Sequence, residues 1–130
     1  IERATINFPT HLNAKKVEEM FLYLHQQGFA IDYTLTTSNK IGYSYIPPQP
    51  DDSIIQTGVK ITGFVHDINR SEMDHFEVLT TFDDEMNSNI TGMRFSLIPG
   101  YEIEEYRNGT LALWNRVRDS VRDYFLREEK

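Results

Sequence analysis

The sequence predicts an α+β fold in which a curved antiparallel sheet of about six strands packs on a long C-terminal helix, with one further helix near the N-terminus. Apolar residues recur with helical spacing in one segment near each end of the chain. Between these segments, apolar and polar residues alternate in short runs, which is typical of half-buried strands. The length of 130 residues fits a single domain over residues 1–130.

The first helical segment covers residues 13–27. Asn13 is expected to cap its N-terminus and Gly28 to end it, because glycine readily adopts a positive φ. A short strand over residues 5–8 precedes the helix, and we expect Pro9 to end that strand. The apolar residues of the helix share one face: Val17, Met20, Phe21 and Leu24.

The alternating runs predict the remaining strands of the sheet. The prolines at positions 47–50 predict a loop, and Pro99-Gly100 predicts a turn. Residues 101–106 are ambiguous and are compatible with a short edge strand guarded by glutamates. The expected strands comprise residues 29–36, 41–45, 59–65, 76–82 and 91–98.

The clearest element is a C-terminal helix over residues 110–127. Its apolar side chains form one stripe: Leu113, Trp114, Val117, Val121, Tyr124 and Phe125. An alternating sheet also has one apolar face to cover. The simplest packing therefore lays this helix across the concave face of the sheet, and the first helix closes one end.

This order of elements resembles the helix-grip fold of the START-related and Bet v 1-like superfamily. The resemblance rests on residues 5–10 with the helix that follows them, on the central hairpins from Gly58 to Phe82, and on the terminal helix from Leu111 to Leu126. It is one of element order and pattern over nearly the whole chain. It implies a hydrophobic ligand cavity between the sheet and the terminal helix, and it brings no catalytic residues. A shared fold does not fix function.

The composition argues against several classes of function. The chain has 13 basic and 20 acidic residues, a net charge of −7 and no cysteine. The acidic balance argues against nucleic-acid binding, and no apolar run approaches the ~20 residues of a membrane-spanning helix. The missing cysteines exclude a disulfide scaffold and a thiol nucleophile, and they favour a cytoplasmic location. No motif indicates a cofactor or a catalytic residue, so an enzyme is not the favoured interpretation.

Aromatic side chains are abundant, with 7 Tyr, 8 Phe and 1 Trp. A cavity for an apolar or aromatic ligand needs large side chains with a few polar tips, and tyrosine supplies both. The alternative is that these residues simply fill the core. The expected ligand-binding residues are Tyr33, Tyr43, Tyr45, Phe82, Phe95, Trp114, Val117, Val121 and Tyr124.

Three other patterns resemble sites and have plainer interpretations. His66 and His75 flank a loop with carboxylates, but their spacing is not a known zinc pattern, so solvated loop residues are favoured and no metal site is expected. The acidic run over residues 83–89 lacks the glycine and the final glutamate of a calcium loop, which leaves a polar turn. Glu102 and Glu104 share one strand face that we expect to be solvated, which does not favour acid–base catalysis.

We therefore expect a non-catalytic binding module for a small apolar or aromatic ligand, held in a cavity between the sheet and the C-terminal helix. The alternative is a protein-interaction or oligomerisation domain with a filled core and no ligand, in which a homodimer is one assembly. A cavity above roughly 300 Å³ favours the first function, and a closed core with an extensive symmetric contact favours the second.

Overall fold

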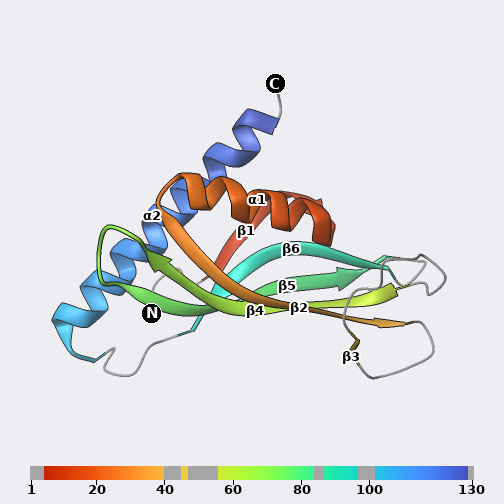
Figure 1. Ribbon diagram of the computed structural model, residues 1–130, viewed down its shortest axis with the longest axis horizontal. Coiled ribbons are helices and arrows are strands. Elements are labelled where there is room, and N and C mark those ends of the chain that lie inside the picture. Colours follow the sequence, from red (N-terminus) through yellow and green to blue (C-terminus); the bar gives the residue numbers. More distant parts are fainter. Residues whose placement is uncertain (1–4, 40–44, 47–55, 84–86, 97–101, 129–130) are drawn as a thin grey trace.

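A computed structural model describes residues 5–39, 45–46, 56–83, 87–96 and 102–128 (Figure 1). The α+β class, the N-terminal helix and the C-terminal helix are confirmed. Neighbouring strands are antiparallel and follow the order β1-β6-β5-β4-β2-β3. The elements in chain order are β1 (Thr5–Leu12), α1 (Ala14–Gln26), β2 (Phe29–Asn39), β3 (Tyr45–Ile46), β4 (Gln56–Asp67), β5 (Met73–Phe82), β6 (Ser88–Phe95) and α2 (Glu104–Glu128).

The sheet consists of five long strands and one very short one. β3 contributes only two residues, which pair with Thr37 and Ser38 at the edge of β2. The expectation of about six strands is therefore met only when this two-residue strand is counted, because the other five strands form the main sheet. The expected loop at residues 47–50 and the expected turn at residues 99–100 lie outside the described residues.

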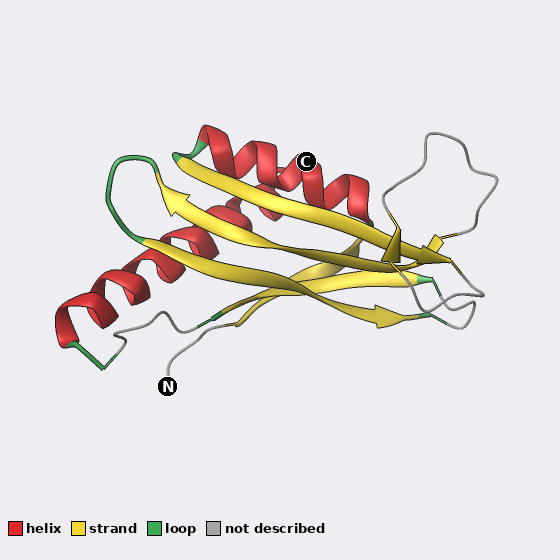
Figure 2. Ribbon diagram, turned by 60° about the horizontal axis from the view of Figure 1, so that its bottom comes forward, coloured by secondary structure: helices red, strands yellow, loops and turns green. Residues whose placement is uncertain are grey.

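Both helices pack on the same face of the sheet (Figure 2). Val65 of β4 and Phe76 of β5 point to that face and have no exposed surface. The ring of Phe21 in α1 lies 5.6 Å from that of Phe76, and the ring of Phe95 in β6 lies 5.8 Å from that of Trp114 in α2. The two helices and the sheet therefore share one core.

The ends of α1 follow the sequence prediction. The side chain of Asn13 accepts a hydrogen bond from the backbone N–H of Lys16 at 2.9 Å, which satisfies one free donor of the first turn. Gly28 follows the helix with a φ of +99°, a conformation that favours glycine. The predicted apolar face is buried.

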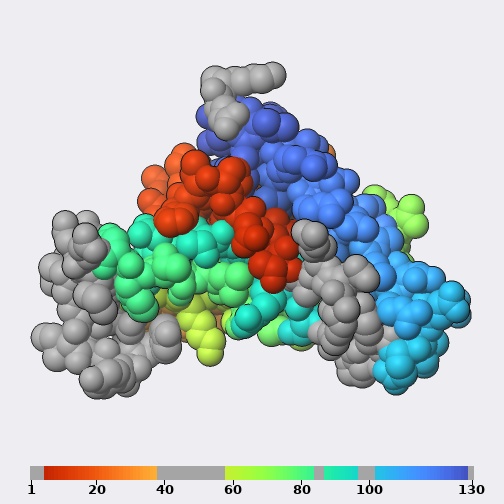
Figure 3. All heavy atoms as spheres, turned by 180° about the vertical axis from the view of Figure 1, so that it is seen from behind, coloured from red at the N-terminus to blue at the C-terminus, as the bar shows by residue number. Residues whose placement is uncertain are grey.

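β1 is longer than expected, and it lies beside α2 when the molecule is seen from behind (Figure 3). Pro9 does not end the strand, which continues to Leu12. The pairing of β1 with β6 shifts register between Asn7 and Leu12. Proline has no N–H to donate, and an irregular stretch at the edge of a sheet tolerates it.

α2 begins at Glu104 rather than at residue 110, so the edge strand that residues 101–106 suggested is wrong for residues 104–106. Glu104 and Glu105 lie in the first turn, where carboxylates interact favourably with the helix dipole. Gly109 lies inside the helix, although glycine there costs about 1 kcal/mol relative to alanine. A Cβ at this position would lie 3.3 Å from Cγ of Glu72, so a larger residue there would require the Glu72 side chain to shift slightly.

Candidate functional site

Beneath the middle of α2, core side chains fill the space between helix and sheet. Leu113 and Val117 have no exposed surface, and Trp114 has almost none. The ring of Phe95 stacks on the indole of Trp114 with an angle of 14° between the ring planes. Because such side chains are surrounded by others at close-packed density, binding space is expected at the edges of this core rather than in its middle.

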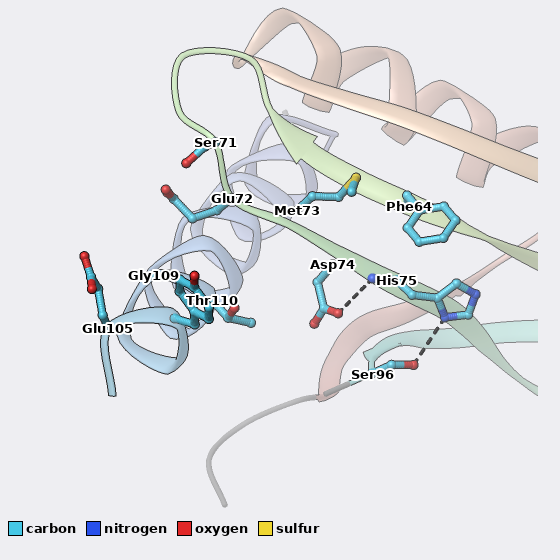
Figure 4. A pocket seen from close by; sticks show the side chains of 11 residues that line it. Phe64, Ser71, Glu72, Met73, Asp74, His75, Ser96, Glu105, Gly109 and Thr110 are labelled. Atoms are coloured by element: carbon cyan, nitrogen blue, oxygen red, sulfur yellow. Dashed lines mark hydrogen bonds between the residues drawn. The ribbon is translucent and has the colours of Figure 1, made fainter. Parts of the chain in front are cut away.

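A cavity of about 640 Å³ opens at the N-terminal end of α2, and we call it the acidic cavity (Figure 4). Its walls come from β4, the β4–β5 loop, β5, Ser96 and the first turns of α2. Pockets of roughly 300–1,000 Å³ accommodate small ligands. The acidic cavity is therefore large enough for a small organic molecule.

The lining of the acidic cavity combines apolar and acidic side chains. Apolar or aromatic groups come from Phe64, Met73 and Tyr106, each about half exposed. Carboxylates come from Glu72, Asp74 and Glu105. Within the lining that the structure describes, there is no lysine or arginine. The cavity thus offers an apolar surface next to a group of carboxylates whose negative charge is only partly neutralised.

Asp74 is the most deeply buried carboxylate of this cavity, with only 1% of its surface exposed. It accepts hydrogen bonds from the indole Nε1–H of Trp114 and from the backbone N–H of His75, both at 2.8 Å. Burial raises the pKa of Asp74 to about 6, even though these two hydrogen bonds favour the charged form. Asp74 therefore changes its charge near pH 6 and links the cavity to the core tryptophan of α2.

His75 follows Asp74 in the chain, but its ring lies on the opposite face of the sheet, because successive strand residues point to opposite sides. Its Nδ1 lies 3.2 Å from Oγ of Ser96, and its ring packs edge-on against Phe64 at 5.2 Å. Asp74 contacts the backbone N–H of His75 rather than its ring. Ser96, His75 and Asp74 therefore do not have the geometry of a Ser-His-Asp triad.

Arg116 fastens the β4–β5 loop, which forms part of the cavity rim, to α2. Its guanidinium lies 2.7 Å from the carboxylate of Asp67 and 3.1 Å from that of Glu72. Asp67 is buried, and its second oxygen accepts a hydrogen bond from the backbone N–H of Asn69. Arg116 already pairs with Glu72, and both carboxylate oxygens of the buried Asp74 accept hydrogen bonds from the protein. Glu105 is exposed and is therefore the lining carboxylate best placed to contact a ligand.

The residues that the sequence suggested for ligand binding do not line one common cavity. Val121 borders a groove of about 540 Å³ between β1 and α2, and Tyr33 borders a cavity of about 390 Å³ between α1 and β2. The hydroxyl of Tyr33 donates a hydrogen bond to Glu18, and burial together with this carboxylate raises the pKa of Tyr33 to about 12. Core positions are occupied by Phe95, Trp114, Val117 and Tyr124.

The remaining suggested residues lie apart from these cavities. Phe82 ends β5 and is 56% exposed, so it is not part of the core. Tyr45 belongs to β3 at the far edge of the sheet. Tyr43 lies outside the described residues.

His66 and His75 lie on the outer face of the sheet, away from the helices. Across β4 and β5, Phe64 pairs with His75 and His66 pairs with Met73. His75 interacts with Ser96 on the neighbouring strand β6 rather than with His66. In the part of the chain that the structure describes, no group of three or more potential ligand side chains is arranged to hold a metal ion.

Sequence reasoning did not identify the acidic cavity. Its walls include the start of α2, which the sequence analysis assigned to an ambiguous segment. One signal was nevertheless present, because Asp74 is in phase with Phe76 and Val78 and so occupies an inward position of β5. A carboxylate at an inward strand position indicates either a buried hydrogen-bonded acid or a functional group.

Two further findings concern the chain as a whole. Among the helices that the structure describes, none combines the length and the apolar character needed to cross a membrane. Comparisons of the chain with protein-family models, with curated proteins and with solved structures found no match.

Proposed function

We propose that this chain is a non-catalytic binding module for a small molecule with an apolar or aromatic body and a cationic amino group, held in the acidic cavity. The observation that carries the proposal is a cavity of about 640 Å³ whose lining combines the carboxylates of Glu72, Asp74 and Glu105 with apolar or aromatic side chains. These apolar or aromatic side chains are Phe64, Met73 and Tyr106. Apolar walls supply most of the contact area in small-molecule sites, and a few polar groups fix the orientation. A carboxylate provides a charge-assisted hydrogen bond to an ammonium group.

The charges around the cavity favour a cation over an anion. A helix N-terminus by itself attracts anions. In α2, however, Glu104 and Glu105 already occupy the first turn. The described lining of the cavity also adds carboxylates and no basic side chain apart from the imidazole of His75. An anionic ligand would therefore be repelled where a cationic one is attracted.

A helix-grip arrangement with a curved sheet, like that of START-related and Bet v 1-like proteins, is part of this proposal. It is supported by the pairing of the first strand with the last strand, and by the position of α2 on the same face as α1. In such an arrangement the sheet and the terminal helix form a cradle, and the acidic cavity lies where α2 begins. The lack of cysteine supports a cytoplasmic setting.

Isothermal titration calorimetry with decylamine, which is protonated at neutral pH, tests the proposal. We expect saturable binding by the native chain at pH 7.5, and binding about tenfold weaker or more after Glu105→Gln, because a charge-assisted hydrogen bond is lost. Asp74→Asn removes a buried charge that the ligand does not contact, and it is expected to weaken binding less. Decanol, which has the same chain and no charge, should bind more weakly than decylamine.

Asp119→Asn is the matched control, because Asp119 lies on an exposed part of α2 outside the acidic cavity. It should leave the affinity for decylamine unchanged. The absence of saturable uptake, or an equal affinity of the native chain, Asp74→Asn and Glu105→Gln for decylamine, would refute a cation site at this position. Circular dichroism on each variant separates a loss of binding from a loss of folding.

A protein-interaction domain is the second candidate, favoured by exposed apolar side chains at the same end of the molecule. A contiguous exposed apolar patch is a common mark of a protein contact. A dimer in sedimentation velocity that Phe64→Ser dissociates, together with no decylamine binding, would favour this second function. The exposed apolar residues are Phe64, Ile68, Met73, Ile103 and Tyr106.

A further inference from the structure

A second recess lies along the other half of α2, between that helix and the edge strand β1, and we call it the basic groove. It has a volume of about 540 Å³. Its floor is apolar and includes Phe8 and Phe125, whose ring centroids lie 5.4 Å apart. Leu126 also lines the groove and is 53% exposed, so part of the apolar surface remains uncovered. Figure 3 shows β1 and α2 side by side on this face.

Arg118 and Arg122, one helical turn apart on α2, are the charged residues of the basic groove. Their side chains are 44% and 63% exposed. Both contact the same carboxylate, that of Asp119, at 3.5 and 2.7 Å. The described lining contains no acidic residue, so the two guanidinium groups exceed the charge of their shared partner. This excess is local, because the whole chain has a net charge of −7.

We propose that the basic groove binds a small apolar anion, namely a molecule with a hydrocarbon or aromatic body and one carboxylate. The planar guanidinium groups of Arg118 and Arg122 suit a carboxylate, which each of them can bind through two parallel hydrogen bonds. The apolar body covers Phe8, Phe125 and the exposed side chain of Leu126. A volume of about 540 Å³ is within the range of roughly 300–1,000 Å³ that small ligands occupy.

A peptide strand added to the edge of β1 fits the groove less well. Regular pairing of β1 with β6 covers Thr5 to Asn7, and the register then shifts. Pro9, which belongs to the lining, has no backbone N–H to offer an added strand. Strand addition requires a row of free backbone donors and acceptors. The groove therefore favours a compact amphipathic molecule that binds through side chains.

This proposal is independent of the acidic cavity, because the two sites share no lining residue and carry opposite charges. Calorimetry with decanoate and the full chain tests it, at concentrations at which decanoate does not form micelles. We expect saturable binding by the native chain. The double variant Arg118→Gln/Arg122→Gln should bind decanoate about tenfold more weakly, since it loses charge-assisted contacts. Decanol should bind the native chain and the double variant equally.

Arg127→Gln is the matched control, since Arg127 lies near the end of the same helix but stacks over the ring of Tyr23 at 5.0 Å, outside the groove. It should leave decanoate binding unchanged. Equal affinity of the native chain and the double variant, no saturable uptake of decanoate, or tighter binding of an acidic peptide strand than of decanoate would each overturn the proposal. If the double variant does not fold, Arg122→Gln alone gives the same test, with an expected loss of about threefold.

Discussion

The two ends of α2 border recesses of opposite charge. At the N-terminal end, the acidic cavity is lined by Glu72, Asp74 and Glu105. Toward the C-terminal end, the basic groove is lined by Arg118 and Arg122. The opposite charges of these side chains therefore give the two recesses different ligand preferences.

The middle of α2 separates these two regions because it is packed. Leu113, Trp114 and Val117 cover the sheet there and line neither recess. Where the apolar stripe of a helix lies continuously on a sheet, its own side chains fill the space between helix and sheet. Space remains where the sheet beneath the helix ends, which is at the β4–β5 loop near one end of α2 and at the edge strand β1 near the other.

The largest expected effect concerns the packed middle. Trp114→Ala removes a buried ring and the donor of the hydrogen bond to Asp74, so it should lower the free energy of unfolding by about 3–5 kcal/mol. Leu126→Ala, at an exposed position of the same helix, should change it by less than about 1 kcal/mol. Urea denaturation measures both values. A loss below about 1 kcal/mol for Trp114→Ala would mean that the middle of α2 is not packed, and the contrast with its ends would disappear.

A smaller effect is expected from the titration of Asp74, which should make the free energy of unfolding depend on pH. Its pKa in the folded chain, about 6, lies above the ordinary value of 3.8, so the folded state binds the proton more tightly. The resulting stabilisation is fully present below about pH 4 and is lost as the pH rises through about 6, with a change of up to about 3 kcal/mol. The ionised carboxylate also attracts a cation, so the affinity for decylamine should rise over the same pH range.

Urea denaturation of the native chain and of Asp74→Asn at several pH values between 4 and 7.5 measures this contribution. Asparagine resembles the protonated carboxyl and has no charge to lose. The difference in unfolding free energy between the two proteins should therefore change most between about pH 4 and pH 6. A difference that stays constant over this range would show that Asp74 does not titrate there.

Local patterns were sufficient to predict most elements of the fold. The apolar face of α1, its Asn13 cap and the glycine at position 28 all depend on neighbouring residues, and the structure confirms them. The start of α2 was missed because Asn108-Gly109 is typical of a turn. In the structure Gly109 lies inside the helix beside the side chain of Glu72, and this contact joins residues far apart in the chain.

The candidate sites were harder to predict, because an apolar pattern specifies burial and not empty volume. Trp114 and Phe95 are large and lie on apolar faces, as residues of a ligand cavity would, yet they stack on each other in the core. The acidic cavity forms where side chains from the ends of several strands and from the start of α2 meet, and a local sequence pattern does not specify such a meeting. The sequence does show that Asp74 occupies an inward position of its strand and that Arg118 and Arg122 share one helix face. Neither pattern indicates how much empty space lies beside these side chains.

Chemical-shift mapping of isotopically labelled protein with decylamine and with decanoate compares the two ends of α2 most directly. The two ligands have the same hydrocarbon chain and opposite charges. We expect decylamine to shift the amide signals of Ser96 and Gly109, and decanoate to shift those of Asn7 and Arg122, with little change at Val117. Shifts of the same residues by both ligands, or shifts centred on Val117, would contradict two oppositely charged sites separated by a packed middle.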